Sequence, residues 1–242
     1  MKLKKWDISL IFYIIKLTYN ICMTEMLTGI VIKKIQLNSD NEVITLLCAD
    51  EIVSFIALGT RKLKSKNRIA LDYGNIISAE IFRARLRNKL SKLKKAVLIK
   101  QPPIKISDTA NVIVAIVKLL SKLENPSQKL FNAIIEAFSY LGDTNNHLVK
   151  TYIAFNTLDS LGVYPSTGQC IECGRADRIS GFDYKDGGFL CSWHVKDERP
   201  LEELKAIFNL DKGISSYIGV DPMLNKKLYE ELIYIINQYI FI

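Results

Sequence analysis

The first hundred residues alternate between short apolar runs and polar turns. Clusters of turn-forming residues separate the runs, such as those at 38–41 and 72–75. A parallel βαβ arrangement would require helices between the runs, and no helical pattern is found there. We therefore predict a small closed β-barrel. Its five expected strands cover residues 29–35, 42–48, 52–58, 76–87 and 96–100.

The apolar period changes after Pro103. Apolar residues then recur every three or four positions, which is the spacing of one helix face. Ser107 is a favoured N-cap residue and marks the start of the first predicted helix. The chain is thus predicted to be α+β, with a barrel domain at 26–103 and a helical domain at 104–242. Later helices are predicted near 126–141, 145–161, 201–208 and 222–239.

The first 25 residues fit neither pattern. Three lysines precede an apolar run at 8–15, which has the outline of a secretory signal. Asp7 and Lys16 interrupt that outline, and the run is too short to span a bilayer. We interpret residues 1–25 as an N-terminal extension and expect translation to start at Met23 or Met26. The alternatives are a short additional helix or a peripheral membrane helix.

The composition is that of a globular protein. Of 242 residues, 49% are hydrophobic and 24% charged, which excludes disordered, collagen-like and coiled-coil chains. Runs of ~18 apolar residues, the length of a transmembrane helix, do not occur, so a membrane partner is not expected. The chain has five cysteines, an odd number, and no convincing secretion signal. Both features favour a protein of the reducing cytoplasm.

The positive charge is concentrated in one segment. The chain carries a net charge of +8, whereas residues 61–105 alone hold fourteen basic and two acidic residues, a net +12. Such segregation favours contact with nucleic acid over an ordinary solvated surface. One part of the segment is a predicted loop that lacks acidic residues. Its five cations are Arg61, Lys62, Lys64, Lys66 and Arg68.

A second basic cluster falls on the fourth predicted strand. Side chains alternate faces along a strand, so Arg83, Arg85 and Arg87 should share one face. The apolar residues between them, from Phe82 to Leu86, should then form the inner face of the barrel. We predict that these three arginines and the five loop cations contact nucleic-acid phosphates. The lysines at 89–95 should continue the patch into a turn.

The strongest chemical signal is a pair of short cysteine motifs. Cys170 and Cys173 form one C-x-x-C turn, and Cys191 and His194 form a C-x-x-H turn seventeen residues later. Three thiolates and one imidazole suit tetrahedral Zn²⁺ and leave no open position for catalysis. We predict a structural zinc knuckle inserted at 168–196, with His194 as the ligand most open to replacement. Cys48 is the last residue of an apolar run and is expected in the core.

Three classes of enzyme can be tested against these motifs. Zinc deaminases require an H-x-E element, but His147 is followed by Leu148 and Val149. The chain contains no phosphate-binding G-x-x-x-x-G-K-[ST] loop. Two histidines, one of them committed to metal, do not assemble a Ser-His-Asp triad. The sequence therefore favours a protein that is not an enzyme.

The order of these parts resembles the bacterial RecO family of DNA repair proteins, from about residue 28 to the C-terminus. The most specific matches are Leu161-Gly-Val-Tyr-Pro-Ser, Cys170-Ile-Glu-Cys-Gly and Gly187-Gly-Phe-Leu-Cys191. The apolar runs at 29–33 and 42–47 and the basic stretch at 58–65 are similar to the first barrel strands and basic loop of that family. Two departures are His194, where many members carry cysteine, and the N-terminal extension.

The resemblance implies an OB-fold barrel and a non-enzymatic recombination mediator in the bacterial cytoplasm, associated with the nucleoid. Such proteins bind single- and double-stranded DNA and anneal complementary strands. They act with RecR, and thereby help RecA to replace single-stranded DNA-binding protein (SSB). The alternative class is a zinc-ribbon protein-interaction or regulatory module that binds DNA only weakly.

Overall fold

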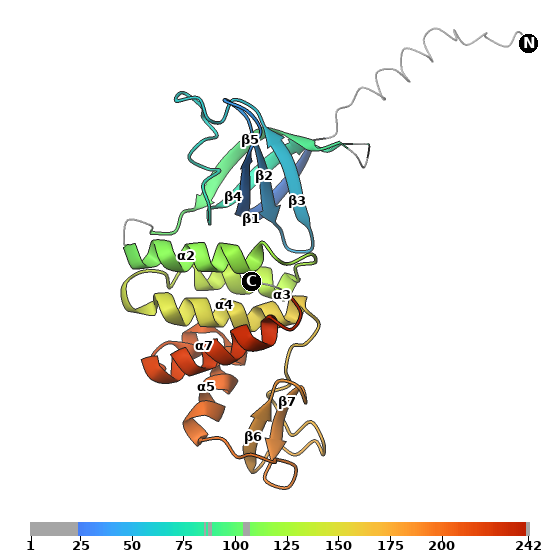
Figure 1. Cartoon of the computed structure of the whole chain (residues 1–242), viewed down its shortest axis with the longest axis vertical. Coiled ribbons are helices and arrows are strands. Elements are labelled where there is room, and N and C mark those ends of the chain that lie inside the picture. Colours follow the sequence, from blue (N-terminus) through green and yellow to red (C-terminus); the bar gives the residue numbers. More distant parts are fainter. Residues whose placement is uncertain (1–23, 85, 87–88, 104–106, 241–242) are drawn as a thin grey trace, which may run out of the picture.

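The computed structural model describes residues 24–240, except 85, 87–88 and 104–106 (Figure 1). Most of the predicted N-terminal extension, including Met23, lies outside the described residues. Thr24 and Glu25 already belong to the first strand.

Five strands form a closed barrel in the order β1-β2-β3-β5-β4. All neighbouring strands are antiparallel except β3 and β5, which are parallel where they close the barrel. A closed five-stranded barrel with this order is the arrangement of an OB-fold, so the predicted barrel is confirmed. The strands are β1 (Thr24–Gln36), β2 (Glu42–Leu47), β3 (Ile52–Ala57), β4 (Ile76–Phe82) and β5 (Ser91–Lys100).

Helices follow the barrel, as the change of period predicted. Side-chain oxygens cap two of them: Ser127 accepts from the N–H of Leu130, and Asp221 accepts from the N–H groups of Met223 and Leu224. A short hairpin that was not predicted, β6 (Ile179–Asp183) with β7 (Gly188–Cys191), interrupts the helical region. The helices are α2 (Ser107–Leu120), α3 (Gln128–Ala137), the 3-10 turn η1 (Asp143–Asn145), α4 (Asn146–Ser160), α5 (Leu201–Lys212), α6 (Ile214–Tyr217) and α7 (Pro222–Ile236).

The molecule is elongated, with the barrel at one end and the β6–β7 hairpin at the other (Figure 1). Helix α2 lies against the barrel, and α4 lies at the centre of the helices, with eleven of its fifteen residues buried. Ile30 and Ile76 of the barrel share one apolar core with Ile113 and Ile116 of α2. The barrel and the helices are therefore packed together over a continuous apolar contact. Within the described part of the chain, no helix is long and apolar enough to cross a membrane.

The fourth strand differs from its prediction in both length and phase. It ends at Phe82, because the N–H of Ala84 donates to the hydroxyl of Ser91 instead of continuing the strand ladder. Ile77, Ala79 and Ile81 face the barrel core, so the odd-numbered residues point inward. Phe82 points outward and Leu86 is 57% exposed, which makes the predicted inner face wrong. Apolar pairs at both ends of the strand, Ile76–Ile77 and Ile81–Phe82, hide the alternation in the sequence.

Strand β5 begins five residues earlier than predicted. Lys92, Lys94 and Lys95 consequently lie on a strand and not in a turn. All three are exposed on the outside of the barrel. The residues that follow, 97–99, are also exposed although they are apolar.

Candidate metal centre and nucleic-acid interface

Two tight turns bring the cysteine motifs together beside the β6–β7 hairpin. In the first turn, the N–H of Cys170 donates to the carbonyl of Arg175, and the N–H of Gly174 donates back to Cys170. Gly174 has a φ of +73°, which a glycine adopts without strain. In the second turn, the N–H groups of His194 and Val195 both donate to the carbonyl of Cys191, the last residue of β7. Each turn therefore presents two ligand atoms on the same side.

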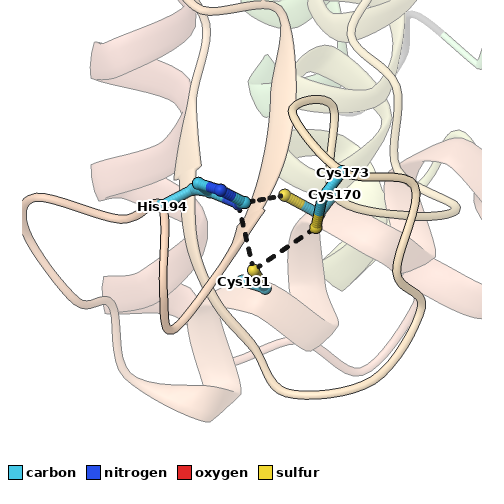
Figure 2. A group of neighbouring side chains, drawn as sticks. All are labelled: Cys170, Cys173, Cys191 and His194. Atoms are coloured by element: carbon cyan, nitrogen blue, oxygen red, sulfur yellow. Dashed lines mark hydrogen bonds between the residues drawn. The ribbon is translucent and has the colours of Figure 1, made fainter.

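The four predicted ligand residues form one cluster (Figure 2), with all ligand atoms within 4.8 Å of one another. Nδ1 of His194 lies 3.5 Å from Sγ of Cys170 and 3.3 Å from Sγ of Cys191, and the sulfurs of Cys173 and Cys191 are 3.8 Å apart. Sulfur at ~2.3 Å and nitrogen at ~2.1 Å from one central ion would lie about 3.6–3.8 Å apart in a tetrahedron. The cluster therefore has the size needed to hold a metal ion.

The environment of Cys170 favours its metal-binding form. Burial disfavours the thiolate, but hydrogen bonds from the knuckle backbone and from His194 outweigh burial and lower the pKa of this thiol to about 6. Metal ions bind the thiolate and not the thiol. Cys48 behaves oppositely: burial and the nearby carboxylate of Glu51 raise its pKa to about 12. It is packed inside the barrel, as predicted for a core residue.

The basic loop between β3 and β4, residues 58–75, is firmly attached to the barrel. Ala70 and Leu71 are buried in the barrel core, and Oδ1 of Asn67 accepts from the N–H of Ala96 on β5 at 3.0 Å. The hydroxyl of Thr60 is buried and donates to Glu42. These contacts fix the path of the loop backbone, from which the remaining side chains extend. Sequence reasoning did not single out these anchoring residues, because nothing local marks their partners.

The five loop cations are all exposed. Lys62 lies 3.5 Å from a carboxylate oxygen of Asp40, in a pair that leaves 64% of the lysine side chain exposed. The other four form no ion pair with any described residue. Because Asn67 binds the β5 backbone beside Lys95, the loop lies next to the strand that carries the exposed lysines 92, 94 and 95. We call this part of the barrel surface the loop–β5 face.

The three predicted strand arginines are in different situations. Arg85 and Arg87 lie outside the described residues. Arg83 is exposed but already engaged: its Nε lies 2.7 Å from Glu25 and its Nη2 lies 2.7 Å from Glu51. Hydrogen bonding to Glu51 raises the pKa of Arg83, although burial opposes this shift. Arg83 therefore joins the start of β1 and the β2–β3 turn to the end of β4.

The fold and the site define a class: an α+β protein with an OB-like barrel, a helical region and an inserted Cys₃His cluster able to bind a metal. Two models of one family match this chain. "Recombination protein O N terminal" matches residues 23–102, and "Recombination protein O C terminal" matches residues 109–205. The chain belongs to the RecO family of DNA repair proteins.

Individual relatives agree with this assignment. The chain is 28% identical over 198 residues to a DNA repair protein RecO of Mesoplasma florum, an alignment that covers 76% of this chain and 73% of the relative. It is 36% identical over 78 residues to a DNA repair protein RecO of Mycoplasma capricolum, covering 32% of this chain and 31% of the relative. A third match, to a DNA repair protein RecO of Syntrophomonas wolfei, is 33% identical over 64 residues and covers 26% of each chain.

Proposed function

We propose that this protein is a non-enzymatic recombination mediator that binds single- and double-stranded DNA and anneals complementary strands. With RecR, it helps RecA to load on DNA coated with SSB, in the cytoplasm at the nucleoid. Membership of the RecO family supports this proposal. The observation that carries it is the basic loop, whose five cations are exposed on a loop anchored at several points to an OB-like barrel.

The physical requirement for annealing is charge neutralisation. Two polyanionic strands approach each other only when cations displace their condensed counterions, and this step needs no nucleotide hydrolysis. We assign the phosphate contacts first to the loop cations, which face few competing carboxylates. Arg85 and Arg87 remain in the proposed set. Arg83 contributes less, because a phosphate would have to displace Glu25 and Glu51.

We further propose that the Cys₃His cluster holds one structural Zn²⁺. Three sulfur atoms and one imidazole nitrogen gathered within 4.8 Å of one another are a donor set that zinc prefers. The apolar core at the two turns is small, consisting of Cys170, Leu190 and Cys191 with a few partly buried neighbours, whereas Phe182 and Phe189 of the hairpin are packed in the main core. When bound, the ion would cross-link two turns that have little other packing. It would leave no open position for a substrate.

The test is annealing of complementary oligonucleotides coated with SSB, in the absence of ATP. We expect rapid annealing by the full chain. A variant with all five loop cations changed to Ala should lose most of this activity. A charge-matched control changes five exposed lysines outside the barrel to Ala: Lys118, Lys122, Lys205, Lys212 and Lys226.

The outcomes separate the two candidate classes. If the control variant anneals normally and the loop variant does not, the basic loop is the DNA-binding surface. Equal loss in both variants would show that only total charge matters. No annealing by a folded, zinc-loaded protein would overturn the mediator proposal in favour of the protein-interaction module.

A further inference from the structure

A tryptophan and two arginines meet on the surface of the knuckle, far from the barrel. Trp193 lies within the second metal-binding turn and is 59% exposed. The guanidinium carbon of Arg175 lies 4.0 Å from the centre of its ring, and that of Arg178 lies 6.0 Å away. Exposing so much of a tryptophan is unfavourable in water. Neither the metal cluster nor the barrel surface uses this ring.

The backbone at Arg178 supports a role for its side chain. Arg178 has a φ of +54° and is the single non-glycine residue in the described part of the chain with a left-handed backbone. Glycine would occupy this position without the cost that a Cβ imposes. The carbonyl of Arg178 accepts from the N–H of Ser192, which ties it to the turn that carries Trp193. The chain therefore carries an arginine at a position where glycine would be less strained, and this arginine places a guanidinium beside the ring of Trp193.

Charge alone does not make this surface attractive to DNA. Residues 168–196 contain four basic and four acidic residues, and Asp177 lies in the same shallow recess as Arg175 and Arg178. Any ligand must therefore be recognised by the ring as well as by the arginines. An aromatic ring flanked by guanidinium groups suits an unpaired base with its neighbouring phosphate, because bases stack on aromatic side chains regardless of their identity. The bases of a duplex are stacked on each other and are not available to it.

We propose that Trp193 stacks on a base of single-stranded DNA while Arg175 and Arg178 bind the adjacent phosphates. The knuckle is then a second nucleic-acid contact, at the opposite end of the molecule from the loop–β5 face (Figure 1). This inference rests on the proposed DNA binding and extends it: the chain holds single-stranded DNA at two separate places. The barrel contact is governed by charge, and the knuckle contact is governed by stacking.

The sequence offers a direct probe of this contact. The chain has two tryptophans, Trp6 and Trp193, so the Trp6→Phe variant leaves Trp193 as the sole tryptophan. Oligo-dT is titrated into this variant, and tryptophan emission is measured beside the anisotropy of a labelled oligonucleotide. We expect emission to be quenched, and its accessibility to acrylamide to fall, over the range in which anisotropy rises. Duplex DNA of the same length should raise anisotropy without protecting Trp193.

Three results would overturn the proposal in distinguishable ways. Binding seen by anisotropy, with unchanged emission and accessibility of Trp193, removes the knuckle contact but leaves the barrel proposal intact. No binding by either signal removes both. Equal protection of Trp193 by duplex and single strand would contradict base stacking.

Substitutions distinguish the loss of a DNA contact from a loss of protein stability. Trp193→Ala should weaken binding of single-stranded DNA by about tenfold, the size expected for one lost stack, and Trp193→Phe should restore most of it. Tyr234→Ala removes an aromatic residue of similar exposure, 64%, from α7 and should change nothing. Arg178→Gly relieves the left-handed backbone, so thermal stability should hold while affinity falls several-fold. Unchanged affinity in both Trp193→Ala and Arg178→Gly would reject the site.

Discussion

Nη2 of Arg83 lies 2.7 Å from Oε1 and 3.0 Å from Oε2 of Glu51, while its Nε lies 2.7 Å from Glu25. The sequence pattern predicts that Arg83 contacts DNA. In the structure, Arg83 is instead held by two carboxylates of its own chain. These carboxylates occupy the donors that a phosphate would need. If DNA binds at this point, its phosphate must compete with the two glutamates for Arg83.

Removing the competing carboxylates should therefore strengthen DNA binding. We expect the double variant Glu25→Gln, Glu51→Gln to bind single-stranded DNA several-fold more tightly at low salt, because one more cation becomes free. Arg83→Ala should change affinity much less than loss of the loop cations does. The ion pairs are more than one third exposed, so their loss should cost the fold about 1 kcal/mol or less.

Fluorescence anisotropy at several salt concentrations measures this competition. The released Arg83 should add about −0.7 to the slope of log K against log salt. The double variant Glu124→Gln, Glu202→Gln, at exposed positions outside the barrel, controls for the general gain of two positive charges. A glutamine double variant that binds no better than this control would mean that Arg83 does not face the DNA.

The loop cations make a separate, quantitative prediction. If all five contact phosphates of a single strand, log K should fall with log salt at a slope near −3.5. Changing the five to Ala should make the slope less steep by about 3.5 and leave only the contribution of the other proposed contacts, whereas the five-lysine control should keep the full slope. Binding constants measured between low and physiological salt give the slope. A steep slope that persists in the loop variant would place the phosphate contacts elsewhere.

The Cys₃His cluster could be predicted from sequence because its information is local. Each C-x-x-[CH] turn places two ligands by itself, and only the meeting of the two turns depends on the fold. The structure brings all four residues together as expected. Cys48 was likewise predictable, since an apolar run containing a cysteine is most simply a buried strand.

The strand arginines were less predictable for a physical reason. The partners of Arg83 are 58 and 32 residues away in sequence, so no local pattern reveals them. The inward face of β4 was misassigned because apolar residues at both of its ends, Ile76–Ile77 and Ile81–Phe82, fit either phase. Ile76 is buried against the helices and Ile77 inside the barrel, so both faces of this strand end are apolar. Register depends on such contacts, which only the fold supplies.

Loss of one of the proposed metal ligands should unfold the two turns that carry them but not the remainder of the chain. Cys191→Ser removes a thiolate from a region with a small apolar core, and zinc binding in small fingers is worth ~10–16 kcal/mol. We expect less than one metal ion per chain and trypsin cleavage at Arg175 and Arg178, with the barrel and helices still folded. Metal analysis and limited proteolysis followed by mass spectrometry measure both effects.

A matched cysteine variant controls for general destabilisation. Cys48→Ala removes a buried thiol of the barrel, distant from the cluster, and should keep the metal and the protease resistance of the knuckle. A chelator should reproduce the effect of Cys191→Ser in the unmodified chain. If the knuckle resists trypsin with its metal removed, the hairpin folds without the ion and the structural role is wrong.

Two glycines test how tightly the barrel is packed on α2. Gly74 and Gly59 both have a left-handed backbone, with φ of +77° and +65°, so a Cβ at either position costs about 1–2 kcal/mol. A Cβ at Gly74 would also lie 2.6 Å from Cγ2 of Ile113 on α2, whereas at Gly59 the nearest atom is 3.9 Å away on a flexible lysine. Gly74→Ala must therefore push α2 from the barrel as well as strain the turn. We expect it to lower the free energy of unfolding by ~2–4 kcal/mol, against about 1–2 kcal/mol for Gly59→Ala.

Urea denaturation of both variants measures the difference, which isolates the contact between barrel and helix. The apolar core is continuous from Ile30 in the barrel to Ile116 in α2, so the whole chain should unfold in one transition whose midpoint shifts more in Gly74→Ala. Equal shifts in the two variants would mean that α2 moves away at little cost. In that case the barrel and the helices would be loosely coupled, and the two proposed DNA contacts could change their separation while one strand is held.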